Sequence, residues 1–327
     1  MEITELNEKI KQESQFVDDL FSEIGKVIIG QKEMIQRLII GLLGNGHVLL
    51  EGLPGLAKTL AINSLASSMD AKFQRIQFTP DLLPADLIGT MIYNQKEGDF
   101  SIKKGPIFAN FILADEINRA PAKVQSALLE AMQERQVTIG HETYKLDEPF
   151  LVLATQNPIE SQGAYELPEA QLDRFMFKIL LDYNSKEQEF EIAKKVTLST
   201  FETPSVVASK EDLDKLKKAV VDVHIDEELE QYIVNLIFAT REPEKYGLDD
   251  IKDYIQFGAS PRATIDMFKA SKAKAFIRGN DHVTPIDIAL VFKDIVRHRI
   301  VLSYEAQAMD ISSDYILQKV LQKVDIP

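Results

Sequence analysis

The chain has 327 residues, enough for two domains, and its 45% apolar and 27% charged residues are typical of a globular protein with a substantial core. Its formal net charge of -14 disfavours binding to the nucleic-acid backbone, which needs clustered Lys and Arg, although a local basic patch stays compatible with this charge. Because the chain contains no cysteine, disulfides, zinc–thiolate sites and thiol catalysis are excluded.

The sequence contains no predicted signal or membrane-spanning segment. Its N-terminal stretch, MEITELNEKIKQES, is charged from the second residue and lacks the apolar core of a secretory signal. The most apolar stretch, Leu38–Leu53, is interrupted by glycine and polar residues and is too short to span a bilayer. We therefore expect a cytoplasmic protein that does not insert into a membrane.

The first half of the chain alternates between predicted helices and short apolar strands. Helices are expected over residues 1–24, 59–69 and 121–134, and strands over residues 47–50, 73–78, 111–114, 150–154 and 175–181. Most of the strands are apolar nearly throughout, as are parallel strands that are covered on both faces. This alternation predicts an α/β fold with a parallel sheet flanked by helices.

Two segments of this half predict β-hairpins inserted between core elements. Thr90–Gly105 has two short alternating runs around the turn sequence QKEGD, and Val137–Leu146 turns at Gly140.

After about residue 183, helix caps replace the strand pattern. Ser185 with Gln188 matches a capping box, and the pairs Ser260-Pro261 and Thr284-Pro285 each place a cap residue before a proline. Gly279 is suited to end a helix, and His298 is expected at a solvated helix end. We therefore predict an α/β domain with an N-terminal helix at residues 1–183 and an all-α domain at residues 184–327.

The stretch GLPGLAKT, residues 52–59, nearly matches the phosphate-binding loop G-x-x-x-x-G-K-[ST]. In such a loop the backbone N–H groups surround phosphate oxygens, Lys58 would reach the β- and γ-phosphates, and the Thr59 hydroxyl would bind Mg²⁺. Ala57 replaces the second glycine, so the stretch alone is equally compatible with an ordinary turn and an exposed lysine. Alanine is strained where φ is positive. We therefore predict a negative φ at Ala57, with Gly52 and Gly55 supplying any unusual conformations.

An acidic pair follows the predicted strand at residues 111–114. Asp115 could hold Mg²⁺ through water, and Glu116 could activate a water molecule for attack on the γ-phosphate. Most Asp-Glu pairs are simply solvated, but the apolar strand and the preceding loop favour the functional interpretation.

Four further polar residues have both a functional and a structural interpretation. Asn157 could bind the attacking water or belong to an Asn-Pro turn, and Arg174 could stabilise phosphate charge in a neighbouring subunit or form a surface salt bridge. Arg262 lies in the first turn of a predicted helix, where a cation needs compensation from a phosphate or a carboxylate. Arg119 could face a neighbouring subunit or form a structural ion pair.

The ordered motifs GLPGLAKT, LADE, ATQNP, AQLDRF and SPRA resemble the AAA+ ATPase superfamily, and longer stretches such as LATQNPIESQGAYELPEAQLDRF closely resemble its MoxR family. The resemblance covers most of residues 26–182 and extends in kind to the C-terminus. MoxR proteins carry alanine in the GLAKT loop, so Ala57 follows the pattern of this family.

This resemblance implies an AAA+ core, a small four-helix lid and the two hairpins as helix-2 and pre-sensor-1 inserts. It implies that Asp115 and Glu116 form Walker B, that Asn157 is sensor 1, and that Arg174 and Arg262 are the arginine finger and sensor 2. The resemblance leaves open whether Arg262 acts on its own nucleotide or a neighbour's. The implied nucleotide-binding residues are Ile28, Gly30, Gly52, Pro54, Gly55, Leu56, Ala57, Lys58, Thr59, Leu60 and Asp115.

The resemblance also implies a function and partners. It implies a ring, typically a hexamer, that hydrolyses ATP with Mg²⁺ bound by Thr59 and Asp115, and that acts as a chaperone in the maturation of a client, such as an enzyme needing a metal or cofactor. A partner with a von Willebrand factor A domain is implied as well, and no nucleic acid is expected. The alternatives are a nucleic-acid motor on the same core and a nucleotide-sensing scaffold, although the retained Glu116 argues against the scaffold.

Overall fold

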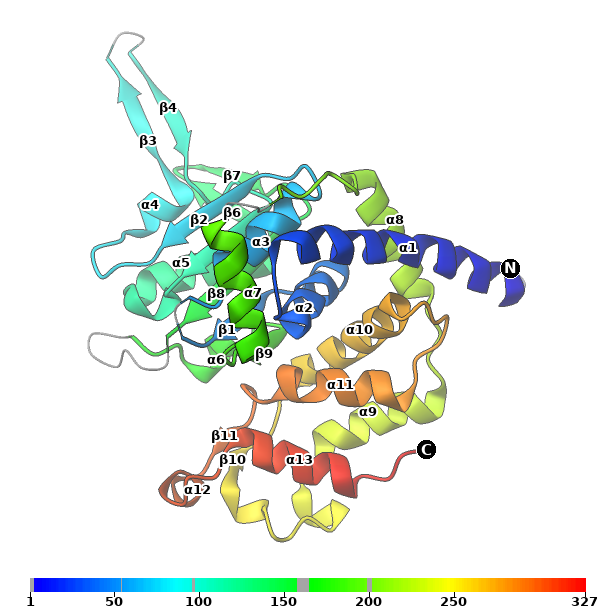
Figure 1. The fold of residues 1–327 in the computed structure, drawn as a ribbon. Coiled ribbons are helices and arrows are strands. Elements are labelled where there is room, and N and C mark those ends of the chain that lie inside the picture. The colour runs from blue at the N-terminus through cyan, green and yellow to red at the C-terminus, as the bar shows by residue number, and fades with distance from the viewer. Residues whose placement is uncertain (1–2, 54, 96–97, 158–164, 199–201) are drawn as a thin grey trace.

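The computed structural model describes residues 3–53, 55–95, 98–157, 165–198 and 202–327. A five-stranded parallel sheet with the strand order β2-β5-β8-β1-β9 lies in the middle of the N-terminal half (Figure 1). All five predicted strands are confirmed: β1 (Val48–Glu51), β2 (Phe73–Gln77), β5 (Phe111–Asp115), β8 (Leu151–Gln156) and β9 (Phe177–Leu180). The chain leaves β1 for the far edge of the sheet, so the carboxyl end of β1 is a topological switch point, where α/β proteins commonly bind ligands.

Helices cover both faces of this sheet, because alternate side chains of each strand point to opposite faces. Val48 and Leu50 belong to an apolar cluster with the N-terminal helices, whereas Leu49 belongs to a second cluster with Leu128 and other residues of the helix between β5 and β6. The helices of this half are α1 (Ile3–Val27), α2 (Lys32–Leu43), α3 (Lys58–Ser67), α4 (Pro84–Ile88), α5 (Ala122–Glu134) and α6 (Glu169–Leu172), with a 3-10 turn at Ile117–Arg119.

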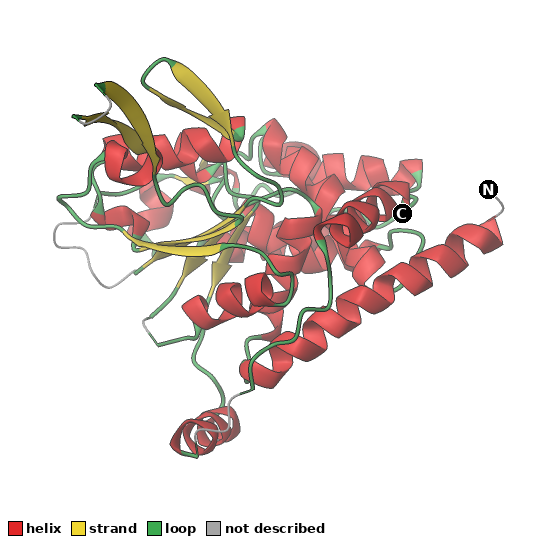
Figure 2. Ribbon diagram, turned by 90° about the horizontal axis from the view of Figure 1, so that it is seen from above, coloured by secondary structure: helices red, strands yellow, loops and turns green. Residues whose placement is uncertain are grey.

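Both predicted hairpins are confirmed. The first consists of β3 (Gly89–Asn94) and β4 (Asp99–Lys104), and the second of β6 (Gln136–Ile139) and β7 (Glu142–Lys145), which turns at Gly140. They lie beside each other, and β3–β4 projects well away from the body of the molecule (Figures 1 and 2).

The C-terminal half is mainly helical, as predicted. Ser185, Ser260 and Thr284 cap helices, and Gly279, with a φ of 73°, follows the end of a helix. The elements are α7 (Lys186–Thr197), α8 (Lys210–Asp222), α9 (Glu227–Ala239), 3-10 turns at Pro243–Tyr246 and Lys252–Tyr254, β10 (Ile255–Phe257), α10 (Pro261–Ile277), α11 (Pro285–Val296), β11 (Val301–Leu302), α12 (Tyr304–Ala308) and α13 (Ser313–Lys323). The antiparallel pair β10–β11 is an addition to the predicted all-α domain, since its strands are too short to show a period in the sequence.

The apolar core continues across the predicted boundary between residues 183 and 184. Helices α1 and α2 pack against α8 and α10, and one buried cluster includes Leu50 of the sheet together with Ile233 and Phe292 of the helical half. The boundary itself stays a prediction.

Within the described residues, no helix combines the length and the apolar character needed to cross a bilayer.

The prediction that His298 lies at a solvated helix end is wrong. The residue is only 6% exposed, and its Nε2 lies 3.0 Å from the carbonyl oxygen of Phe175. Burial is the main reason that its pKa lies well below the usual value. The turn after α11 packs against the segment that precedes β9, and this contact between distant segments removes the imidazole from solvent.

Candidate nucleotide-binding site

The loop after β1, and the ends of β5 and β8, line a pocket of about 460 Å³ at the carboxyl edge of the sheet. We call it the carboxyl-edge pocket. It brings together most of the residues that the sequence motifs predicted, with four additions, Arg75, Gln77, Thr155 and Gln156. Its lining residues are Gly52, Gly55, Leu56, Ala57, Lys58, Thr59, Leu60, Arg75, Gln77, Asp115, Glu116, Thr155, Gln156 and Asn157.

The predicted negative φ at Ala57 is wrong. Ala57 precedes α3 in the left-handed conformation, with φ 56° and ψ 21°, which costs an alanine about 1 kcal/mol. A left-handed residue at this position turns the loop so that its N–H groups can converge on an anion, and this requirement overrides the preference of the alanine. Gly55 has a φ of 88° as expected, and Pro54 lies outside the described residues.

Gly52 is needed for space rather than for a positive φ. A Cβ atom at this position would lie 2.8 Å from the Cβ of Leu181, closer than real Cβ atoms approach. The glycine therefore lets the first residue of the loop pack directly against the chain after β9.

Lys58 begins α3 and points back across the loop. Its Nζ donates a hydrogen bond of 2.6 Å to the carbonyl oxygen of Gly52. Burial lowers the pKa of Lys58, while the charges of Asp115 and Glu116 oppose that shift. Thr59, the next residue, is exposed and lines the same pocket, so its hydroxyl is free to meet a ligand there.

Asp115 ends β5 and is held from two sides. The Thr155 hydroxyl donates to its Oδ1 at 2.7 Å, and Nη2 of Arg75 donates to its Oδ2 at 2.6 Å. The hydroxyl of Thr59 and the carboxylate of Asp115 are hard oxygen donors of the kind that Mg²⁺ prefers, so the donor set fits this ion. No motif in the sequence signals Arg75, which lies in the middle of β2.

Glu116 follows in the left-handed conformation, with a φ of 56°. Nε2 of Gln77 donates to its Oε2 at 2.8 Å, and Nη1 of Arg119 lies 3.2 Å from the same oxygen. The structural ion pair considered for Arg119 is therefore present. In this conformation the Glu116 carboxylate is paired rather than free in the pocket.

A second pocket lies beside the start of α2, near the carboxyl end of β9. Gly30 and Gln31 line it together with Tyr183 and Gln188, and the Gln31 side chain donates to the carbonyl oxygen of Asp182 at 3.1 Å. A Cβ atom at Gly30 would lie 2.8 Å from Oδ1 of Asn184. Ile28, which the resemblance also implied, is buried in the apolar cluster instead and is not part of this lining.

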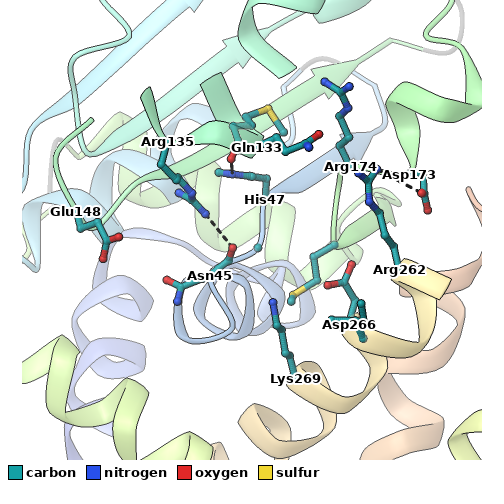
Figure 3. A pocket seen from close by; sticks show the side chains of 14 residues that line it. Asn45, His47, Gln133, Arg135, Glu148, Asp173, Arg174, Arg262, Asp266 and Lys269 are labelled. Carbon is teal, nitrogen blue, oxygen red and sulfur yellow. Dashed lines mark hydrogen bonds and ion pairs between the residues drawn. The ribbon is translucent and has the colours of Figure 1, made fainter. Parts of the chain in front are cut away.

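Arg174 and Arg262 lie together in a third pocket, at the amino edge of the sheet (Figure 3). We call it the amino-edge pocket, and Asn45, His47, Arg135, Asp266 and Lys269 are among its other lining residues. Nη1 of Arg262 lies 3.5 Å from Oδ2 of Asp173. Strand β1 has four residues, so about 13 Å of strand separates this pocket from the carboxyl-edge pocket. The structure therefore places the two arginines in one pocket, away from Lys58.

Backbone strain is concentrated around these three pockets. Seven non-glycine residues of the described chain have a positive φ, and five of them line a pocket: Gln31, Asn45, Ala57, Glu116 and Arg135. Such conformations persist where the surrounding structure enforces them, and they cluster at functional sites.

The switch-point loop and the acidic strand end define a P-loop nucleotide-binding protein of the α/β class. A family model described as the ATPase family associated with various cellular activities matches residues 47–177, and a model of the AAA lid domain matches residues 249–320.

Individual relatives are similar over almost the whole chain. Chaperone MoxR1 of Mycobacterium tuberculosis is 49% identical over 93% of this chain and 81% of its own length, and Protein MoxR of Paracoccus denitrificans is 31% identical over 87% and 88%. A crystal structure of a proposed ATPase from Cytophaga hutchinsonii superposes with a TM-score of 0.94 at 55% identity, covering 100% of this chain and 99% of the other. The chain belongs to the MoxR family of AAA+ ATPases, which confirms the resemblance and the predicted AAA+ core and lid.

Proposed function

We propose that this AAA+ ATPase hydrolyses ATP with Mg²⁺ in a ring of identical subunits and uses the reaction to remodel a client protein. The observation that carries the proposal is the separation of the candidate residues between two edges of one sheet. Lys58, Asp115 and Glu116 line one pocket, whereas Arg174 and Arg262 line the other, so a complete site needs a second copy of the chain.

At the carboxyl edge, the loop N–H groups and Lys58 would bind the phosphates, and the Lys58 ammonium would leave the Gly52 carbonyl for them. Mg²⁺ held through Thr59 and Asp115 would neutralise charge on the β- and γ-phosphates. Glu116 would leave Gln77 and Arg119 and accept a proton from the attacking water, which Asn157 would help to orient. Gly30 and its neighbours would surround the base.

At the amino edge, Arg174 and Arg262 would stabilise the charge on the γ-phosphate of a nucleotide bound by the neighbouring subunit. The proposal is thus that Arg262 acts on the nucleotide of a neighbouring subunit rather than on its own. Among the described residues, the Arg262 charge at the first turn of α10 is compensated by a 3.5 Å contact with Asp173, and a phosphate would add to that compensation.

A protein client is the proposed target, since one close relative is named a chaperone. We extend the proposal to maturation of an enzyme that needs a metal or cofactor, with a von Willebrand factor A domain protein as partner. A nucleic-acid motor is the second candidate. The β3–β4 hairpin presents Lys103 and Lys104 with Tyr93 and Phe100, which form an aromatic pair with ring centroids 5.2 Å apart. The acidic chain favours the protein client.

The test measures Mg²⁺-dependent phosphate release and the size of the assembly with ATP, for the parent chain, Lys58→Ala and Glu116→Gln. We expect the parent to assemble and hydrolyse ATP, Lys58→Ala to lose both nucleotide binding and turnover, and Glu116→Gln to assemble without turnover. A pull-down with the Glu116→Gln chain and ATP should then retain the client. Client effects that survive in both variants would contradict the motor, and tight, salt-sensitive DNA binding in a filter assay would favour the second candidate.

A further inference from the structure

Arg299 lies in the turn between α11 and β11, and its side chain is almost fully buried, with 1% exposed. Its Nη2 donates to the carbonyl oxygens of Asp173, at 3.2 Å, and of Phe175, at 2.8 Å. These two carbonyls belong to the residues on either side of Arg174. One guanidinium from the lid therefore holds the backbone that carries Arg174.

The same guanidinium also holds the helix that carries Arg262. Nη2 of Arg299 donates to Oδ2 of Asp266 at 2.6 Å, and Asp266 lies one turn after Arg262 on α10. Nε of Arg299 lies 3.0 Å from Oδ1 of Asp173, an ion-pair distance, although its N–H does not point at that oxygen. Asp173 in turn accepts a hydrogen bond of 2.7 Å from Ser260, the cap of α10.

Breaking any one of these contacts alone would destabilise the folded protein. A buried guanidinium needs its acceptors, and a mostly buried carboxylate that loses its partner is strongly destabilised. A rotation of α10 relative to the segment before β9 would separate Arg299 from Asp266 or from Phe175. The network therefore makes Arg174 and Arg262 move as one unit.

We infer that Arg299 is a positioning residue: it fixes Arg174 of the core and Arg262 of the lid as a matched pair that faces the nucleotide of a neighbouring copy. This inference rests on the proposed function, because it presumes that the two arginines act on the neighbour's site. Arg299 itself, being buried, does not touch the nucleotide.

The chain offers a matched control two residues away. Arg297 is also largely buried, at 10% exposed, and pairs with Asp314 at 2.8 Å and Asp294 at 2.7 Å. It joins the lid to the core through the carbonyl oxygen of Lys178, on β9, and has no hydrogen bond or ion pair with Asp173, Phe175 or Asp266 among those of the described residues. Losing Arg297 should therefore disturb stability to a similar extent without freeing Arg174.

The experiment compares ATP hydrolysis by Arg299→Lys, Arg297→Lys and Arg174→Ala, each alone and mixed with Lys58→Ala. Lysine keeps the charge but loses the planar fork that reaches several acceptors. We expect kcat of Arg299→Lys to fall about ten- to a hundredfold, since small misplacements of catalytic groups have effects of this size. Its KM for ATP should stay within about twofold, because its own nucleotide pocket is intact. Arg297→Lys should lose a similar amount of thermal stability and keep most of its kcat.

Mixing separates a positioning role from a general loss of structure. Lys58→Ala subunits are inactive alone but carry an intact Arg174, Arg262 and Arg299, so they should restore turnover at the intact pockets of Arg299→Lys and of Arg174→Ala. If Arg174→Ala is restored and Arg299→Lys is not, the positioning role is refuted while the proposed function stands. If neither is restored, action on the neighbour's nucleotide is refuted, and the inference fails with it. Should Arg299→Lys not fold, Asp266→Ala removes the acceptor of Arg299 on α10 alone, and the same outcomes are expected of this variant.

Discussion

The two edges of the parallel sheet carry the two parts of the proposed site, and these parts are assembled in different ways. At the carboxyl edge, Lys58, Asp115 and Glu116 each lie within a few residues of a strand end, so local sequence places them. At the amino edge, Arg174 comes from the core and Arg262 from the lid, and Arg299 joins them through a buried network. The carboxyl edge therefore depends on the geometry of one loop and one strand, whereas the amino edge depends on the packing of two distant segments.

The largest effect that we expect on either edge of the sheet is the loss of ATP turnover when Arg174 is replaced. Arg174→Ala should lower ATP turnover by about 10³-fold or more, because an arginine that stabilises the transferring phosphoryl group has an effect of this size. ATP binding should stay unchanged, since Arg174 lies at the opposite edge of the sheet from the carboxyl-edge pocket, where we propose that ATP binds. Steady-state kinetics and titration with a fluorescent nucleotide measure the two quantities. The exposed Lys123→Ala serves as control, and a large loss of ATP affinity in Arg174→Ala would place the residue at its own nucleotide instead.

At the carboxyl edge, Glu116→Gln should lower turnover by about 10²-fold or more while leaving ATP bound, because an amide cannot take the proton of the attacking water. The Gln side chain can still accept a hydrogen bond from Gln77, so the local geometry should survive. Single-turnover phosphate release is the measurement. Glu130→Gln, on the exposed face of α5, is the matched control. Turnover near that of the parent would refute the role of Glu116 as the base.

Lowering the pH should reduce the free energy of unfolding through His47, which lies at the amino edge of the sheet. This imidazole accepts a 3.0 Å hydrogen bond from the Val152 N–H and lies 3.2 Å from the Met132 carbonyl oxygen; burial first, and Arg135 second, lower its pKa to about 3. Between that pKa and the ordinary 6.5, the unfolded chain binds the proton more readily, so stability is complete above pH 6.5 and falls as the pH falls. At about pH 5.5 the loss should be about 1 kcal/mol.

Chemical denaturation at about pH 7.5 and pH 5.5 checks this sign and size. The amide of His47→Gln can make the same two hydrogen bonds but does not titrate, so this variant should lose less stability between the two pH values. His298, whose pKa is also lowered by burial, should act in the same direction in both proteins. An identical pH dependence of the parent and the variant would show that His47 is not the cause.

The smallest expected effect concerns the left-handed Ala57. Ala57→Gly should relieve about 1 kcal/mol of strain, and the greater freedom of glycine in the unfolded chain should offset most of it. The free energy of unfolding should therefore change by less than about 1 kcal/mol. Ala193→Gly, in the exposed helix α7, should cost about 1 kcal/mol and serves as control. An equal loss in both variants would mean that Ala57 has an ordinary helical backbone in solution.

Sequence predicted the carboxyl edge well because strands, loop and acidic pair follow one another within short stretches of chain. All five strands, both hairpins and the caps at Ser185, Ser260 and Thr284 were predicted from local patterns. The conformation of Ala57 was predicted wrongly, because the intrinsic preference of alanine points the other way and only the fold of the loop overrides it.

The features that sequence missed depend on contacts between distant segments. His298 and Arg299 follow a helix and look solvated, yet both are buried against residues 173–175, far away along the chain. Arg75 pairs with Asp115 across neighbouring strands, and no local pattern marks an arginine in the middle of a strand as a partner of a site residue. These positions become recognisable only once the sheet order and the packing of the lid are known.

The apolar cluster that runs from Leu50 of the sheet to Phe292 of α11 has a consequence for the stability of isolated fragments of this protein. Helices α1 and α2 bury their apolar side chains against α8 and α10 of the C-terminal half. A fragment that stopped at residue 183 would expose this shared apolar interior to solvent, and the resulting apolar surface would favour self-association. The two halves should therefore melt in a single cooperative transition, and a soluble, well-behaved lid expressed on its own is not to be expected.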